Sequence, residues 1–268
     1  MRSEDAATRW CKGLGVEIGA FKNPIPGIRP IYVDKFAVYA NEPTLAQYFG
    51  EATDLPFADE SLDYVASSHV LEHTANPVKA LNEWHRVLKP GGVVYMVVPD
   101  KQFTFDSPRE TTPSPHMVED FLNDVDDTDP THIEDFVYGI DWTEFAPQDS
   151  PEEGRVNRDE LAQSYRLATS RKDIINIHFH VFTEDSIREL ILAINEEDRI
   201  PHRWRIEETV PRFPVETPNG ILFVLRKPKP MLDLSPLRRF MKKFAHPDYP
   251  LLETAKVATP EGEFKERA

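Results

Sequence analysis

Cysteine is nearly absent from this chain, which has one, Cys11, among 268 residues. A single cysteine excludes an intramolecular disulfide bond. Long apolar runs are also missing, and no charged start leads into an apolar stretch and a cleavage site. We therefore expect a cytoplasmic protein with no transmembrane segment.

Basic residues are also scarce, because 31 Lys and Arg face 46 Asp and Glu, which leaves a formal net charge of -15. Such a charge repels a nucleic-acid backbone, so we predict no nucleic-acid partner. Residues 100–176 hold nineteen acidic and seven basic residues, a difference of -12. This acidic segment is either a well-solvated set of surface helices and loops or a region with a task of its own.

The first part of the chain has little room for a helix. Residues 14–18 and 31–34 are short apolar runs typical of buried parallel strands. Only twelve residues separate them, and these include Pro24, Pro26 and Pro30. Because proline breaks a helix interior, we expect the first crossover helix to be reduced to a turn or lost.

The rest of the pattern predicts a Rossmann-like α/β fold, in which a doubly wound, mostly parallel sheet of seven strands ends in an antiparallel strand. The tight turn at residues 218–220 (PNG) indicates the antiparallel hairpin. The further predicted strands are 51–57, one ending near 67, 93–99, 174–182, 203–210 and 221–226. The predicted helices are 43–49, 77–88, 115–126, 131–140, 157–168 and 183–196.

Three regions follow from this pattern. Residues 1–99 and 174–227 form the predicted core, and residues 100–173 form an acidic helical insertion that we expect to act as a substrate lid. Residues 228–268 form a C-terminal extension with a short basic amphipathic helix in LRRFMKKF. We expect that helix to dock on the domain itself, with an anionic membrane surface as the alternative.

A glycine turn after the first strand and an acid at the end of the second indicate a nucleoside-containing ligand. Gly19 lets a ligand approach the backbone, and Asp34 is placed to accept hydrogen bonds from two ribose hydroxyls. The segment between them offers no helix N-terminus for a pyrophosphate, which disfavours NAD. No tyrosine is followed four residues later by lysine, as a short-chain reductase would need.

The order of further motifs resembles the class I S-adenosylmethionine-dependent methyltransferases, in the branch with small-molecule substrates. The likeness covers about residues 13–100. It rests on VEIGA (16–20), YVD (32–34), GEATDLPFADESLDYVASSHVLEH (50–73) and NEWHRVLKPGGVVYMVVPD (82–100). The implied cofactor is S-adenosylmethionine.

The resemblance implies a role for each matching position. Glu17, Gly19 and Ala20 would hold the methionine end of the cofactor, and Asp34 the ribose. The remaining implied cofactor residues are Glu51 at the adenine amino group, the Ala52 backbone at the ring edge, and Ser67, Ser68 and His69 near the sulfonium. The family's usual glycine triplet corresponds here to Gly19, Ala20 and Phe21. We expect the Phe21 side chain to form part of the wall of the cofactor pocket. The alternative is a protein that binds the cofactor but does not catalyse methyl transfer.

Methyl transfer to a hydroxyl needs a base, and histidine suits that role near neutral pH. His178 and His180 alternate on a predicted strand and so would face the same side. His116 and His73 are the other candidates at the mouth of the pocket. A divalent cation such as Mg²⁺ that orients a sugar diol is a further prediction.

Two stretches bear on the substrate and on another enzyme class. TPSPHMVEDF (112–121) and IHFHVFT (177–183) resemble methyltransferases of polysaccharide and glycoside assembly, which favours a sugar or glycoside hydroxyl as the acceptor. HVLEH (69–73) also fits the H-x-x-E-H spacing of one group of zinc hydrolases, through His69, Glu72 and His73. That spacing needs a continuous helix, whereas here a strand has just ended.

Overall fold

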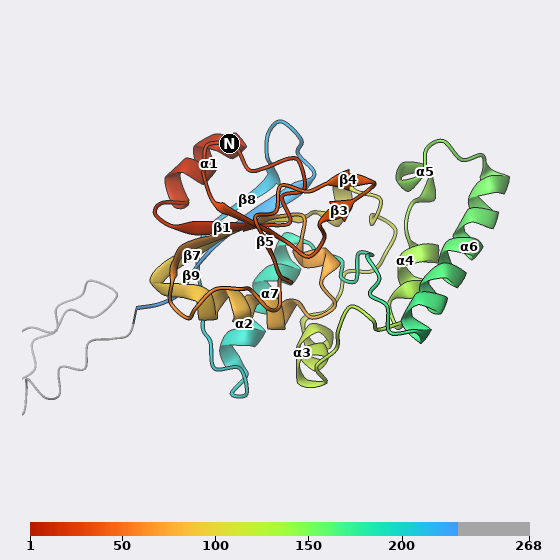
Figure 1. Ribbon diagram of the computed structural model, residues 1–268. Helices are drawn as coiled ribbons and strands as arrows, with labels where there is room; N and C mark the ends of the chain where they lie inside the picture. The colour runs from red at the N-terminus through yellow and green to blue at the C-terminus, as the bar shows by residue number, and fades with distance from the viewer. Residues whose placement is uncertain (230–268) are drawn as a thin grey trace, which may run out of the picture. The chain divides into compact units, whose positions relative to one another are not determined.

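One seven-stranded sheet organises the computed structural model, which describes residues 1–229 (Figure 1). The strand order is β5-β2-β1-β6-β7-β9-β8. The first five strands are parallel, while β9 is antiparallel to both β7 and β8. The strands of this sheet are β1 (Gly15–Ile18), β2 (Ile31–Asp34), β5 (Tyr48–Phe49), β6 (Leu62–Ser68), β7 (Leu88–Pro99), β8 (Arg205–Phe213) and β9 (Gly220–Arg226). The predicted fold class is confirmed.

Helices cover the two faces of the sheet unequally. Helices α2, α3 and α7 pack on one face, and the short α1 lies over the other (Figure 1). The helices are α1 (Ser3–Trp10), α2 (Pro77–Val87), α3 (Ser114–Leu122), α4 (Ile133–Gly139), α5 (Trp142–Phe145), α6 (Pro151–Ser170) and α7 (Glu184–Glu196), with 3₁₀ turns η1 (Leu71–His73) and η2 (Lys101–Phe103). Within residues 1–229 no helix is long and apolar enough to span a membrane.

Strand β7 lies in the interior of the sheet and is buried on both faces. Val94, Met96 and Val98 belong to the core under α2 and α7. The alternate residues, including Tyr95 and Val97, belong to the core under α1. Side chains of a strand alternate between faces, so a continuous apolar run fits a strand with packing on both sides.

The link between β1 and β2 contains no helix, as the prolines predicted. The expected helix over residues 43–49 is wrong. This stretch holds the end of the small hairpin of β3 (Val38–Tyr39) and β4 (Glu42–Pro43) and then β5. Its large apolar side chains, Leu45, Tyr48 and Phe49, are exposed, so a helix here would have no apolar face to bury.

Residues 51–57 are not the predicted third strand, since β5 occupies that place. Side chains of α2 hold this loop instead. The Leu55 N–H donates to Glu83 (2.7 Å), and Arg86 donates to the carbonyl of Phe57 (2.9 Å). Because these side chains satisfy its hydrogen-bonding groups, the loop backbone does not need to pair with a neighbouring strand.

Residues 174–182 are extended but form no strand, contrary to the prediction. Their backbone N–H groups donate to loops: Ile175 to Asp127 O (2.9 Å) and Phe179 to Glu72 O (2.8 Å). Bends at Ile177 and His180 interrupt the alternation. His178 and His180 therefore do not face one common side.

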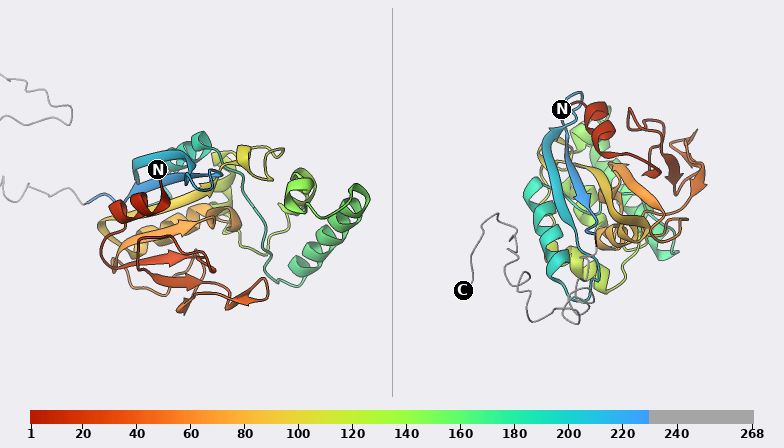
Figure 2. Two further views of the ribbon diagram at one scale, coloured as in Figure 1. Left: turned by 90° about the horizontal axis from the view of Figure 1, so that it is seen from above. Right: turned by 90° about the vertical axis from the view of Figure 1, so that its left-hand side faces the viewer.

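The insertion 100–173 divides into two parts. Helix α3 packs against α2 and α7 and places Met117 in the main core. Helices α4, α5 and α6 stand to one side of the sheet (Figure 2) and share a smaller core with Ile177 and Phe179. Helix α6 begins earlier than predicted, because Ser150 and Glu153 form a capping box. The expected C-terminal helix lies outside the described residues.

Candidate functional site

A cavity of about 360 Å³ lies at the carboxyl ends of β1, β2 and β6. This size is typical of small-molecule sites. Eight of the nine predicted cofactor residues line it: Glu17, Gly19, Ala20, Asp34, Glu51, Ala52, Ser68 and His69. The ninth, Ser67, is fully buried at the end of β6 and does not line the cavity.

Gly19 forms the turn that opens the cavity. Its φ is +68°, and a Cβ atom at this position would lie 2.7 Å from Cγ2 of Val70. Its N–H donates to the Val33 carbonyl (2.9 Å), which fixes the turn against β2. Phe21 also takes a positive φ of 47° and lines the cavity, so an aromatic ring stands where the family triplet has its last glycine.

Glu17 presents an unsatisfied carboxylate oxygen beside the cavity. Its side chain is buried, and Oε1 accepts a hydrogen bond from the Ile25 N–H (2.8 Å). Oε2 has no hydrogen-bond partner among residues 1–229. Burial raises the pKa of Glu17 to about 7, although the bond from Ile25 opposes this. A cationic ligand group that met Oε2 would satisfy it.

This raised pKa predicts a pH-dependent stability cost. An unfolded glutamate releases its proton near its ordinary pKa, and the folded Glu17 does so only near pH 7, so the cost grows as the pH rises between these values. The difference corresponds to at most about 3 kcal/mol. Glu17→Gln should therefore gain stability relative to wild type at pH 7.5 but not at pH 4.5, as measured by urea unfolding.

The exposed Glu196→Gln is the matched control and should show no such pH-dependent difference. An equal effect of Glu17→Gln at both pH values would contradict the assignment.

Asp34 ends β2 at the cavity wall. Its Oδ1 accepts from the Phe36 N–H (3.0 Å), which fixes the carboxylate. The next residue, Lys35, pairs with Asp127 of the insertion (2.8 Å), and Asp127 Oδ1 also accepts from the Ala75 N–H (2.9 Å). Both Lys35 and Asp127 line the cavity, so the insertion contributes directly to it.

Backbone contacts from β2 and α2 fix the opposite wall. The Gly50 N–H donates to the Asp34 carbonyl (3.2 Å), and the indole of Trp84 donates to the Ala52 carbonyl (3.0 Å). Glu51 is exposed, and its Oε2 accepts only from the Thr53 hydroxyl (3.4 Å) in the part of the chain described. This carboxylate is free to meet a ligand.

Sequence reasoning predicted Phe21 at the cofactor but missed the other two residues of an aromatic wall, Phe36 and Tyr39. Tyr39 stacks on Phe36 and meets Phe21 edge to face, with ring centroids 5.8 and 5.4 Å away. Its hydroxyl accepts from the Asn176 side chain (3.1 Å), which comes from the segment after the insertion. The only sequence signal was the aromatic spacing in DKFAVY, directly after the second-strand acid.

His73 lines the cavity next to the predicted sulfonium position, and Glu72, which does not line it, lies beside His73. Glu72 is fully buried and has His69 Nδ1 at 3.5 Å and His73 Nε2 at 3.9 Å. Burial lowers the pKa of His73 to about 4, against the attraction of Glu72. Burial alone would lower the pKa of His69 too, but the Glu72 carboxylate raises it above its ordinary value.

His178 stands behind His73, with ring centroids 4.6 Å apart. Its Nδ1 lies 2.5 Å from Oδ2 of Asp106, whose Oδ1 accepts from Arg109 (2.7 Å). Arg109 is fully buried and also pairs with Asp135 (2.6 Å). His178 itself does not line the cavity, so this chain of groups packs against His73 from outside it.

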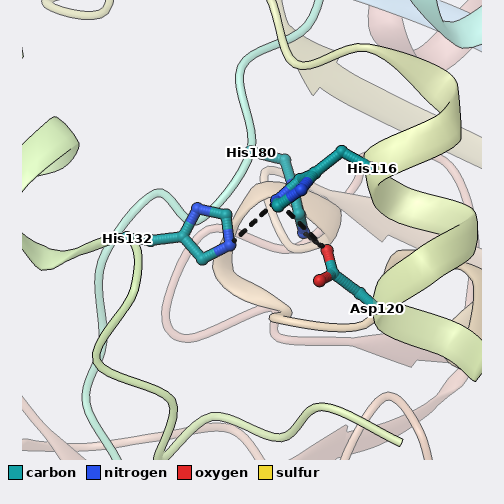
Figure 3. Close-up of side chains that lie close together, drawn as sticks. All are labelled: His116, Asp120, His132 and His180. Atoms are coloured by element: carbon teal, nitrogen blue, oxygen red, sulfur yellow. Dashed lines mark hydrogen bonds and ion pairs between the residues drawn. The ribbon is translucent and has the colours of Figure 1, made fainter. Parts of the chain in front are cut away.

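The other two candidate histidines lie elsewhere. His116 and His180 join His132 and Asp120 in a second cluster (Figure 3), and none of the four lines the cavity. The expectation that His178 and His180 act as a pair is wrong. The bends at residues 177 and 180 direct them to different clusters.

Residues 33–96 match the family model of a methyltransferase domain. A probable S-adenosylmethionine-dependent methyltransferase from Mycolicibacterium smegmatis is 35% identical over 78 residues, which cover 29% of this chain and 30% of that protein. A demethylmenaquinone methyltransferase from Staphylococcus epidermidis is 51% identical over 45 residues, or 17% and 19% of the two chains. The matched segments thus span less than a third of these relatives.

Among solved structures, a methyltransferase from Methanosarcina mazei is 14% identical, with a TM-score of 0.46 over 85% of this chain and 100% of that one. The sequence comparisons support S-adenosylmethionine as the cofactor. Residues 33–96 thus carry methyltransferase-domain sequence, set in a seven-stranded sheet with the Rossmann-like fold of class I S-adenosylmethionine-dependent methyltransferases.

Proposed function

We propose that this protein is an S-adenosylmethionine-dependent methyltransferase that transfers a methyl group to a hydroxyl of a small molecule, in particular a sugar or glycoside. The observation that carries the proposal is a single cavity that joins eight predicted cofactor residues to a half-buried imidazole, His73. The small-molecule hydroxyl and the histidine mechanism belong to the proposal.

The residues present fit the cofactor. Glu17 Oε2 lacks a partner in the described chain and would accept from the cofactor ammonium, while Asp34 would accept from the ribose hydroxyls. Because Gly19 has no side chain, the cofactor can approach the backbone there. A Cβ atom at this position would clash with Val70. When bound, the cofactor supplies a methyl group on a sulfonium, which is a good leaving group.

His73 is the group we assign as the base. Its Nδ1 is buried without a hydrogen-bond partner in residues 1–229, and its low pKa keeps the imidazole neutral at pH 7. His73 would take the proton of the acceptor hydroxyl as that oxygen receives the methyl group supplied by the bound cofactor, and Glu72 would stabilise the resulting imidazolium.

The acceptor side of the cavity draws on the insertion. We propose that residues 100–173 act as a lid and side wall, supported by Asp127 and by Asn176, which directly follows them. Their negative charge suits a neutral or cationic acceptor rather than a polyanion. A sugar is neutral and offers hydroxyls, which agrees with the likeness noted for residues 112–121 and 177–183.

A binding screen followed by a turnover assay tests the proposal. S-adenosylmethionine and S-adenosylhomocysteine should raise the melting temperature, since each binds only the folded chain. A methyl-release assay over neutral glycosides should then identify the acceptor. Stabilisation by NAD alone would overturn the assignment of S-adenosylmethionine as the cofactor. Binding of S-adenosylmethionine without methyl transfer to any acceptor would favour the non-catalytic alternative.

Replacing the proposed base should separate catalysis from binding. His73→Gln should lower kcat about 10²- to 10⁴-fold, the usual contribution of a general base, and leave S-adenosylhomocysteine affinity within about threefold. In the wild type, kcat/KM should fall only as the pH drops toward about 4, because the base must be unprotonated. Methyl-release kinetics measure kcat and kcat/KM, and calorimetry measures the affinity for S-adenosylhomocysteine.

His202→Gln is the control, since His202 stacks on His85 outside the cavity and should leave kcat unchanged. Full activity of His73→Gln would remove His73 from this role.

Two finer predictions concern metals. If Mg²⁺ orients the acceptor, a chelator should abolish turnover and added Mg²⁺ should restore it. The zinc-hydrolase alternative finds no support, because β6 ends at Ser68 and residues 71–73 form the 3₁₀ turn η1. The continuous helix that the H-x-x-E-H spacing requires is therefore absent from residues 69–73.

A further inference from the structure

Outside the cavity, four metal-ligating side chains converge in one place. His116 and Asp120 lie one turn apart on α3, His132 directly precedes α4, and His180 precedes α7 (Figure 3). Each offers a donor atom, and these atoms all lie within 4.8 Å of one another. Asp120 and His132 are each 7% exposed, and His180 is fully buried.

We propose that His116, Asp120, His132 and His180 bind a divalent transition-metal ion, with zinc as the expected occupant. Three imidazole nitrogens and one carboxylate oxygen are a donor set that zinc uses in tetrahedral sites. Mg²⁺ prefers oxygen ligands, so this site differs from the magnesium prediction for the acceptor. The inference does not rest on the proposed function.

The spacing of the donors matches such a site. Ligand bonds of about 2.0–2.1 Å in tetrahedral geometry place neighbouring donors about 3.3 Å apart. His116 Nε2 lies 3.3 Å from His132 Nε2 and 3.5 Å from Asp120 Oδ2. His180 Nε2 lies 3.7 Å from the same carboxylate oxygen. Small side-chain movements would bring all four onto one ion.

Without an ion, this cluster leaves a carboxylate oxygen poorly satisfied. Asp120 Oδ2 is buried with no hydrogen-bond partner in the described chain. His180 Nε2 would give up its contact with the Ala75 carbonyl (3.0 Å), and the ring proton would move to Nδ1.

Four protein ligands would fill the coordination shell, which is typical of a structural site. The ion would join α3, the start of α4 and the segment before α7. Asp127 lies on the loop between two of these ligands and pairs with Lys35 in the cavity. We infer that the metal fixes this wall of the pocket. His116, with 39% of its side chain exposed, leaves a path for entry.

Metal content of the full chain tests the proposal. Protein purified from zinc-supplemented cells and dialysed against a weak chelator should retain about one zinc per chain by mass spectrometry. His116→Gln and His180→Gln should each weaken zinc binding at least about 100-fold, the upper range for losing even an outer-shell partner. Cobalt substitution should give tetrahedral absorption bands in the wild type only.

His202→Gln is the control outside any cluster, and His73→Gln tests the separate group of Glu72, His73 and His178. Both should keep wild-type zinc content. Because His180 is fully buried, the more exposed His116 keeps the test valid if His180→Gln fails to fold. Wild type without zinc, full zinc in His116→Gln, or loss of zinc in His73→Gln would each overturn the assignment.

Discussion

Asp34→Ala should weaken binding of S-adenosylmethionine by at least about 100-fold. A hydrogen bond to a charged group contributes about 1.5–3 kcal/mol, and the proposed role of Asp34 gives it two, one to each ribose hydroxyl. The carboxylate is already fixed at the cavity wall by the Phe36 N–H, so the ligand does not have to order it. Calorimetric titration with S-adenosylhomocysteine measures the loss.

Asp34→Asn sharpens this experiment, because its side-chain oxygen can still accept from Phe36 while the charge is lost. It should bind more weakly than wild type and more tightly than Asp34→Ala. Asp198→Ala removes an exposed aspartate that does not line the cavity and should bind normally. Wild-type affinity in Asp34→Ala would refute the nucleoside site and with it the proposed function.

Arg109→Met should lower the free energy of unfolding by about 3–5 kcal/mol. Arg109 is fully buried and balances the buried Asp106 (2.7 Å), so its loss leaves a desolvated carboxylate without its cation. Methionine fills most of the space, which limits any cavity effect. Urea unfolding followed by circular dichroism measures the change.

Arg166→Met is the matched control in the same insertion. Arg166 pairs with Glu134 at the surface, where both side chains are about half exposed, so its removal should cost no more than about 1 kcal/mol. The double variant of Asp106→Asn with Arg109→Met should be less destabilised than the sum of the two single changes. Equal losses for Arg109→Met and Arg166→Met would contradict a special role for the buried pair.

Together, these two predictions distinguish a residue proposed to bind the ligand from a residue that stabilises the structure behind the cavity. In the proposed function Asp34 contacts the ligand directly, whereas Arg109 is linked through Asp106 to His178, whose ring packs against His73. Destabilisation by Arg109→Met is therefore expected alongside lower turnover, while Asp34→Ala should reduce binding at nearly unchanged stability. Melting temperatures of both variants without ligand distinguish the two effects.

Local patterns in the sequence were enough for much of the fold and for one side of the site. Apolar runs at β1, β2 and β7 predicted parallel strands, because a strand buried on both faces must be apolar throughout. The prolines before β2 predicted the missing crossover helix. Residues at strand ends also gather at one edge of a parallel sheet, so Gly19 and Asp34 could be predicted to share a pocket, and the resemblance to methyltransferases implied the other positions from Glu17 to His69.

The positions of the candidate histidines could be determined only from the tertiary structure. Alternation over residues 174–182 predicted a strand, but loops satisfy its backbone, and two bends send His178 toward Asp106 and His180 toward Asp120. The aromatic wall and the contact of Asp127 with Lys35 likewise join residues far apart in the chain. Short-range periodicity records which face of an element is buried, but it carries no information on which distant loop lies against that face.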